Sequence, residues 1–232
     1  MAVVRENLST GSGGSSTTHT INFGFTATAG RLLVIGFGNS GSASTFSSYS
    51  PFSLVHEATG TRNMSAAMIY KVAAGGETSA SVTLNASAVL EWIVSEYSGL
   101  DTSAPLDQSA ENEANQTGST VTSLATGTTA ALATATGYAI SFWAGDAASW
   151  PGGSYTFAQG SSTVSVSGTT LGLLMAQLQL ASASGFAETV QNTAADQVYG
   201  MVAVFKQASA GGGGTLQYPR LLESSLIRGI LR

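Results

Sequence analysis

The sequence predicts an all-β protein, an antiparallel β-sandwich of jelly-roll-like type that is followed by a C-terminal arm. The chain is rich in Ser, Thr and Gly, and 43% of its residues are hydrophobic whereas only 9% are charged. Several segments alternate apolar and polar residues with a period of two, which is the pattern of a strand with one face in water. Turn-forming residues separate these segments at short intervals. We therefore expect ten or more strands in two packed sheets.

Two kinds of strand are expected. Residues 19–25, 80–84 and 164–166 alternate between apolar and polar side chains, as in strands with one exposed face. Other segments are apolar on both faces and suit central strands that lie between two layers. These two-sided segments are Leu32–Phe37, Ala66–Val72, Val89–Val94, Tyr138–Trp143 and Val198–Phe205. The segment Leu171–Ala181 is long enough for a helix, but its leucines recur at every second position, so a strand is expected there.

The predicted domain boundaries follow changes in composition. Residues 1–16 are polar and rich in Gly and Ser, and are expected to form an N-terminal arm. Residues 17–207 are expected to form the β-sandwich domain. Residues 208–214 contain four consecutive glycines, which is typical of a flexible linker. Residues 215–232 are then expected to form a separate C-terminal docking arm.

The C-terminal arm is unusually aliphatic for a segment outside a folded domain. Residues 1–210 carry five basic and twelve acidic side chains, whereas the arm carries three arginines against one acid, Glu223. Both an imperfect amphipathic helix and an extended strand remain open for this segment. We expect it to insert into a partner subunit through its aliphatic and basic side chains, which are Arg220, Leu221, Leu222, Leu226, Ile227, Arg228, Ile230, Leu231 and Arg232.

Composition also argues against several classes of protein. Without cysteine, the chain has neither disulfides nor thiolate metal ligands. The acidic body argues against nucleic-acid binding, which requires a basic face. No apolar run reaches the length that spans a bilayer, so no membrane partner is expected. The first residues lack the apolar stretch of a signal peptide, which predicts synthesis in the cytoplasm.

One motif matches the glycine spacing of nucleotide-binding loops. Residues Gly36–Gly41 read GFGNSG and follow an apolar strand, with Glu57 about twenty residues further on. In a dinucleotide site, the last glycine opens a helix whose N-terminus faces the pyrophosphate. Residues 42–51 are Ser-rich and have no helical apolar face, so a β-turn is expected and no cofactor is predicted.

Catalytic and metal-binding constellations are not evident in the sequence. His19 lies on a strand face with Ile21, and neither it nor His56 belongs to a G-x-S-x-G elbow or a zinc motif. Glu91 and Glu96 are an odd number of residues apart on one strand, which predicts opposite faces and argues against the carboxylate pair of a glycoside hydrolase. Carboxylates at 101–113 do not match a calcium loop. We therefore expect a protein that is not an enzyme and that binds no metal.

Aromatic residues near Pro151 suggest an alternative role in carbohydrate binding. Trp150 and Tyr155 flank the turn Pro151–Gly153, and exposed rings at a sandwich edge can stack on sugars. Trp143 belongs to a two-sided apolar strand and is expected in the core. Trp150 and Tyr155 are therefore the candidate residues for a glycan site.

Three segments resemble β-sandwich proteins that are encoded in the structural gene clusters of tailed bacteriophages. Val94–Asp101 reads VSEYSGLD and is followed by PLD at 105–107, while Gly137–Trp143 and Met201–Lys206 are similar closing strands. The resemblance covers about residues 17–207 and is carried by short motifs. It implies a virion protein without catalytic residues, either a capsid decoration (cement) protein, a minor tail component or a receptor-facing module.

These observations predict a non-enzymatic structural protein of the phage virion. Its expected partners are other virion proteins, namely capsid or tail subunits, and further copies of itself in a homo-oligomer such as a trimer. Docking is expected to use the C-terminal arm. The alternative prediction is a carbohydrate-binding, receptor-facing module of a phage or of a bacterial surface protein, with a host glycan as its ligand.

Overall fold

The computed structural model describes residues 2–41, 44–59, 64–112 and 121–209. Within these ranges the chain forms strands and connections but no helix, and thus no helix that could cross a membrane. The strands are β1 (Val4–Asn22), β2 (Leu32–Ser40), β3 (Phe46–Ser48), β4 (Ser53–Thr59), β5 (Met64–Val72), β6 (Ser79–Ser98), β7 (Leu106–Asn112), β8 (Val121–Ala125), β9 (Gly137–Gly145), β10 (Tyr155–Phe157), β11 (Ser162–Ser167), β12 (Gly172–Leu180), β13 (Thr189–Asp196) and β14 (Val198–Lys206).

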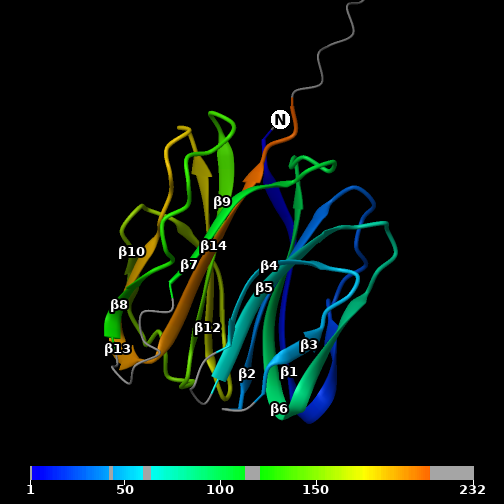
Figure 1. Ribbon diagram of the computed structural model, residues 1–232, viewed down its shortest axis with the longest axis vertical. Helices are drawn as coiled ribbons and strands as arrows, with labels where there is room; N and C mark the ends of the chain where they lie inside the picture. Colours follow the sequence, from blue (N-terminus) through cyan, green and yellow to red (C-terminus); the bar gives the residue numbers. More distant parts are fainter. Residues whose placement is uncertain (1, 42–43, 60–63, 113–120, 210–232) are drawn as a thin grey trace, which may run out of the picture.

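The strands form antiparallel sheets that pack as a sandwich (Figure 1). One sheet has the order β1-β6-β2-β5-β4, with β3 paired to β6, and the facing sheet has the order β11-β12-β9-β14-β7. A smaller sheet, β10-β13-β8, covers the outer side of the second one. The predicted all-β antiparallel sandwich is therefore confirmed, and the predicted C-terminal arm lies outside the described residues.

The central core fills the space between the two large sheets. The two-sided apolar segments that the sequence predicted became β2, β5, β9, β14 and the second half of β6, and their side chains are buried. Two glycines of β2 allow the sheets to approach closely. A Cβ atom on Gly36 would lie 2.4 Å from the Phe142 ring, and one on Gly38 would lie 3.0 Å from Leu171. Residues Gly36–Ser40 belong to strand β2, so the predicted β-turn at this motif is wrong.

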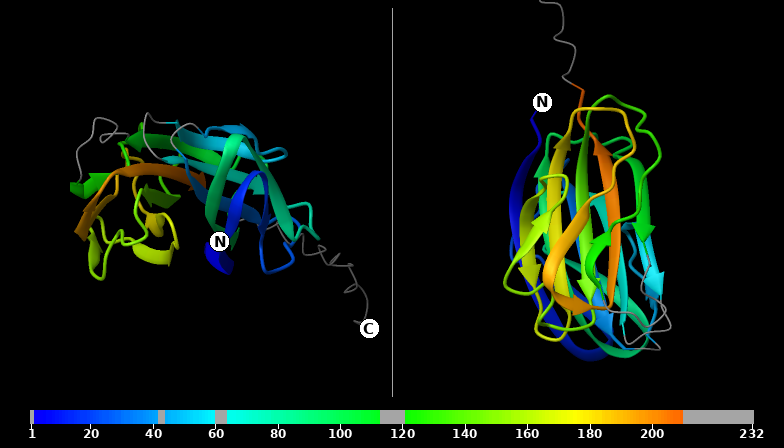
Figure 2. Two further views of the ribbon diagram at one scale, coloured as in Figure 1. Left: turned by 90° about the horizontal axis from the view of Figure 1, so that it is seen from below. Right: turned by 90° about the vertical axis from the view of Figure 1, so that its left-hand side faces the viewer.

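A second core lies on the other face of the six-stranded sheet. Strands β1 and β6 are long enough to bend, and the sheet curls so that their paired ends return over β2 and β5 (Figure 2). As a result, Ile21 and Val82 pack in one cluster with Leu33 and Ile35. The inward curl explains why residues 19–22 and 80–84 alternate although β2 and β5 are apolar on both faces.

A third core lies between the five-stranded sheet and the smaller sheet. Trp143 and Leu174 belong to the central strands and pack there against Leu124 of β8 and Val190 of β13. The strand predicted over 171–181 in preference to a helix is confirmed as β12. Trp143 lies in the core, as the sequence predicted, and is fully buried.

The N-terminal segment differs from the prediction of a polar arm. Strand β1 begins at Val4 and pairs with β6 along its length, so most of residues 1–16 belong to the six-stranded sheet. The polar sequence of this strand concealed its role. A Cβ atom on Gly11 would lie 2.6 Å from the Trp92 ring, and one on Gly13 would lie 2.7 Å from Nδ1 of His19. The glycines thus provide room for rings from elsewhere in the sheet, and the strand needs no large side chains of its own.

The turn between β5 and β6 contains a carboxylate with an unusually low pKa. Glu77 Oε1 accepts hydrogen bonds from Lys71 Nζ and from the Ala74 N–H, both at 2.8 Å, and Oε2 accepts from the Gly75 N–H at 2.7 Å. The Lys71 ammonium is the main cause, aided by these backbone N–H groups, and together they lower the pKa of Glu77 to about 2. Glu77 therefore holds the turn through its charged form.

This geometry predicts a pH-dependent contribution to stability. Because the pKa of Glu77 is lower in the folded state, its stabilisation is present above the unfolded pKa, near 4.5, and is lost as pH falls towards 2. We expect Glu77→Gln to lower the free energy of unfolding at pH 7 by about 1–2 kcal/mol, since solvent screens this partly exposed pair. Urea unfolding from pH 7 to pH 2 should show the difference from wild type closing below pH 4.5. A difference that is independent of pH would contradict the assignment.

Candidate functional site

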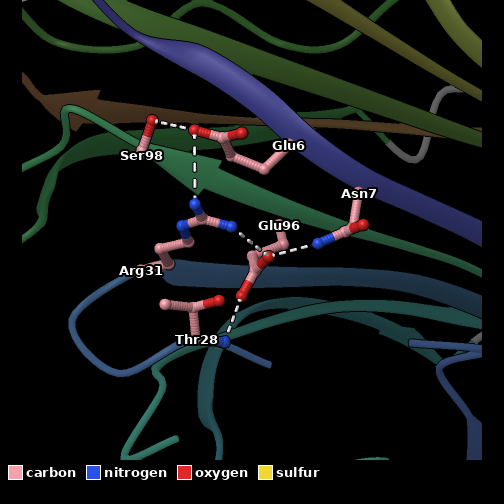
Figure 3. A network of polar contacts seen from close by, with 6 residues as sticks. All are labelled: Glu6, Asn7, Thr28, Arg31, Glu96 and Ser98. Carbon is pink, nitrogen blue, oxygen red and sulfur yellow. Dashed lines mark hydrogen bonds and ion pairs between the residues drawn. The ribbon is translucent and has the colours of Figure 1, made fainter. Parts of the chain in front are cut away.

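Glu96 is a fully buried carboxylate at the junction of β1 with β6 (Figure 3). Its Oε1 accepts a hydrogen bond from the Thr28 N–H at 2.6 Å, and its Oε2 accepts from Asn7 Nδ2 at 2.6 Å. Arg31 Nη1 donates to the same Oε2 at 3.1 Å, while Arg31 Nη2 lies 3.6 Å from Glu6. Glu96 thus ties β1 and the connection before β2 to β6. Both of its oxygens are bonded to donors from β1 and from the connection before β2, which is the arrangement of a structural carboxylate.

Glu91 is also fully buried, but it lies on the opposite face of β6. Its Oε1 accepts hydrogen bonds from the N–H and hydroxyl of Thr169 and from the N–H of Thr170, at 2.7–2.9 Å. Glu91 therefore faces the second sheet and anchors the connection between β11 and β12, whereas Glu96 faces the second core. The prediction of opposite faces is confirmed. Because β6 separates them, these two carboxylates cannot act together on one bond of a substrate.

Two further acids on the outer layer have similar roles. Glu188 is fully buried and accepts hydrogen bonds from the Gln159 N–H at 2.8 Å and from the Ser161 hydroxyl, which fixes the turn between β10 and β11. Asp196 Oδ2 accepts from the Ala147 N–H at 2.8 Å, and burial raises the pKa of Asp196. Each of these acids stabilises a connection. No group of three or more His, Cys, Asp or Glu side chains in the described ranges has the arrangement of a metal site.

The two histidines are far apart in the six-stranded sheet. His19 is on β1 and His56 is on β4, and these strands are the opposite edges of the sheet. His19 is nearly buried, and its Nε2 lies 3.0 Å from the Ser16 carbonyl oxygen. Because three strands separate the two imidazoles, they cannot form a common site.

Trp150 is not the exposed ring that the sequence predicted. Its side chain is only 1% exposed and packs in the third core. Two glycines create the space, since a Cβ atom on Gly145 would lie 2.9 Å from the Trp150 ring and one on Gly172 would lie 2.2 Å from the Trp150 carbonyl oxygen. Asp196 holds the turn that carries the ring. In this position Trp150 cannot stack on a sugar, and its proposed part in a glycan site is wrong for this conformation.

Tyr155, the second predicted glycan residue, does line a surface groove. The groove has a volume of about 220 Å³ and lies along β10 and β13. Tyr155 is half-buried, and its hydroxyl lies 3.2 Å from the Thr163 hydroxyl. Strand β13, which forms one side of this groove, was not predicted from the sequence. The β-branched residues Thr189 and Val190 at its start could have indicated a strand. The lining residues are Ser154, Tyr155, Thr156, Gln191, Asn192 and Thr193.

A larger groove lies at the sandwich edge formed by β4 and β7. Its volume is about 490 Å³, and the connection before β7 forms one wall. Tyr70 and Lys71 of β5 form part of the other wall. The Lys71 ammonium is already engaged by Glu77 at 2.8 Å, so the groove offers a ligand a mixed surface without a free charge from these residues. Neither side of it was indicated by the sequence.

The predicted docking residues between Arg220 and Arg232 lie outside the described residues. The structure does describe where the chain leaves the sandwich. The Ala208 N–H donates to the Gly99 carbonyl oxygen at 2.9 Å, and Gly99 packs directly against the backbone of Ala2 and Val3. The described part of the chain therefore ends beside the start of β1, at the end of the molecule that carries the N-terminus (Figure 1).

Comparisons with known proteins provide no further assignment. No protein-family model, no curated protein and no solved structure matches this chain.

Proposed function

We propose that this chain is a non-enzymatic structural subunit of a tailed-bacteriophage virion, either a capsid decoration protein or a minor tail component. In this role the sandwich is a rigid body that contacts neighbouring subunits, and residues 215–232 dock onto a partner. The buried carboxylates are consistent with it, because Glu91, Glu96 and Glu188 each accept several hydrogen bonds from the chain itself.

The main support for this proposal is the position of the exposed apolar side chains on edge strands. Among the described residues, the large hydrophobic side chains that are exposed are Val4, Leu8, Leu54 and Val166. All four lie on strands at an edge of a large sheet, namely β1, β4 and β11. Edge strands have unpaired backbone groups, and most monomeric proteins protect them with charges or prolines. Apolar edges are instead suited to contacts between subunits.

The N-terminal strand shows this most clearly. It is 19 residues long, and between Asn7 and Thr18 it has no charged residue and no proline. Its free edge therefore lacks two of the common features that prevent strand pairing between molecules. Because the described chain ends beside the start of this strand, an arm that follows it would leave the molecule next to the beginning of β1.

Charge supports an arm that binds an acidic neighbour. Residues 1–210 have seven more acidic than basic side chains, whereas the arm has two more basic than acidic ones. Attraction between the arm and the body of another copy, or an equally acidic partner, would favour encounter and correct orientation. Repeated display on a shell would then strengthen a weak single contact through avidity.

Deletion of residues 211–232 tests the proposal. We expect the shortened chain to keep the thermal stability of the full chain, because the cores described above lie within residues 2–209. We also expect it to be lost from assembled particles, measured as copies per particle by quantitative mass spectrometry. The matched control replaces the four glycines 211–214 by Ser, which keeps the arm and should retain incorporation. Unchanged incorporation of the shortened chain would overturn the docking role.

A further inference from the structure

We propose that the groove between β10 and β13 is a carbohydrate site that accepts one neutral sugar ring. This goes beyond a structural role, since it would give the outer layer of the molecule a ligand of its own. The groove is too small for a drug-sized ligand, for which pockets of about 300–1,000 Å³ are usual. Its volume of about 220 Å³ instead suits a ligand of one ring.

The lining of the groove selects for hydroxyl-rich, uncharged ligands. Its six residues are three hydroxyl side chains, two amides and one tyrosine, and none of them carries a charge. Amides and hydroxyls both donate and accept hydrogen bonds, which matches the alternating donors and acceptors of a sugar. An anion would find no cation among these residues, while the Tyr155 ring and the carbon atoms of the threonine and amide side chains offer apolar surface to the C–H face of a sugar.

Tyr155 is held in place as a rigid aromatic surface. Its hydroxyl lies 3.2 Å from the Thr163 hydroxyl, and its ring meets Phe157 edge-on with 5.7 Å between centroids. Phe157 in turn stacks on the buried Trp143, also at 5.7 Å. A ring that is fixed in this way loses little conformational entropy on binding, and one apolar face combined with a polar tip is suited to a sugar.

Asn192 supplies an independent observation that points to a ligand. It is directly opposite Tyr155 in the β10–β13 pair, and its Oδ1 is buried without a hydrogen-bond partner. An unpaired acceptor beside a groove is free to accept a hydrogen bond from a group that enters the groove, although Trp92 Nε1 and Trp150 Nε1 are also buried without a partner. A sugar hydroxyl that enters the groove can donate to this oxygen after a small side-chain rotation.

The groove and the chain exit are on different parts of the molecule. Strands β10 and β13 form the outer layer on one side, whereas β14 ends beside the N-terminus (Figure 1). A subunit that is docked through its C-terminal residues therefore leaves the groove free. The carbohydrate site does not require the proposed virion role, and the two can be tested separately.

Titration of the full-length protein with sugars tests this inference. We expect neutral hexoses or N-acetylhexosamines to bind in the millimolar range, seen as NMR shifts of the Asn192 and Gln191 side-chain amides. Tyr155→Ala should weaken binding about tenfold, since it removes the aromatic surface. Tyr155→Phe should retain binding within about threefold, because it keeps the ring. Tyr70→Ala, in the larger groove, is the matched control and should leave binding unchanged.

Several outcomes would overturn the inference. The first two are that no neutral sugar causes NMR shifts, or that only acidic sugars bind. The third is that binding is lost in Tyr70→Ala but kept in Tyr155→Ala. The fourth is that a peptide, and no sugar, binds by adding a strand to the edge of β10. If Tyr155→Ala fails to fold, Gln191→Ala provides the second variant, because Gln191 is exposed and its loss should weaken binding without unfolding the protein. Unaltered affinity in Gln191→Ala would then count against the site.

Discussion

Replacing Glu96 by Ala is expected to lower the free energy of unfolding by about 3–5 kcal/mol, because each donor left without its acceptor costs about 1–3 kcal/mol. Glu96 is fully buried, and its loss leaves the Thr28 N–H and the Asn7 amide without their acceptor. Arg31 would lose its hydrogen bond to the buried carboxylate and keep only the longer contact with Glu6. Urea unfolding of the variant, followed by tryptophan fluorescence, measures this loss.

Glu6→Ala is the matched control for this variant. Glu6 contacts the same guanidinium at 3.6 Å, but it is partly exposed, and pairs of this kind contribute about 0–1 kcal/mol. We therefore expect a large difference between two substitutions that each remove one acidic partner of Arg31. Equal effects would show that burial does not decide the role of Glu96, and would contradict its assignment as the anchor of β1.

Trp150→Ala is also expected to cost about 3–5 kcal/mol, as is usual when a buried tryptophan is truncated. The side chain is 1% exposed, and the space created by Gly145 and Gly172 would become a cavity. An exposed ring in a loop would instead cost less than about 0.5 kcal/mol. Thermal unfolding thus separates a core role for Trp150 from the surface role that the sequence suggested.

Tyr155→Ala provides the comparison for Trp150→Ala. Tyr155 is half-buried beside the third core, so we expect a smaller loss of stability than for Trp150. If Trp150→Ala left the unfolding temperature unchanged, the Trp150 ring would lie in solvent and would not belong to the third core.

Much of the architecture could be predicted from the sequence, because apolar periodicity is strong in the central strands. The two-sided segments at 32–37, 138–143 and 198–205 all became strands that are covered on both faces. The polar strands were missed. Strands β7 and β13 contain mostly Ser, Thr, Asn, Gln and acidic residues, and β8 and β10 are only five and three residues long. What identifies these four strands is their pairing with distant segments.

Most of the wrong structural predictions concern glycine, because a glycine can either permit a turn or make room for a side chain from elsewhere in the fold. At Gly152, in the predicted turn Pro151–Gly153, it occupies a backbone conformation with positive φ, as it also does at Gly75 between β5 and β6. At Gly11 and Gly36 it instead makes room for an aromatic ring from another strand, and at Gly145 for the Trp150 ring from the connection that follows β9. A sequence does not show which ring will approach which glycine. For this reason the polar arm at 1–16 and the turn at 38–41 were wrong.

The candidate sites could be predicted only in part. The opposite faces of Glu91 and Glu96 followed from their odd spacing and are confirmed. Tyr155 was identified from its aromatic neighbourhood, and the structure places it in a groove. Its partner Asn192 is 37 positions away, and only the β10–β13 pairing brings the two side chains together. The docking residues of the arm remain a prediction.

The positions of β1 and β14 determine how such a molecule would be oriented on a larger assembly. The first strand begins and the last one ends at the same pole of the long axis (Figure 1). A subunit that is tethered by the residues following 209 would have both chain ends nearest to its attachment point, and the pole where β14 begins, at Val198, would be the more distant one. Because residues 208–214 are expected to be flexible, contacts along the flanks of neighbouring subunits would then determine the tilt of each one.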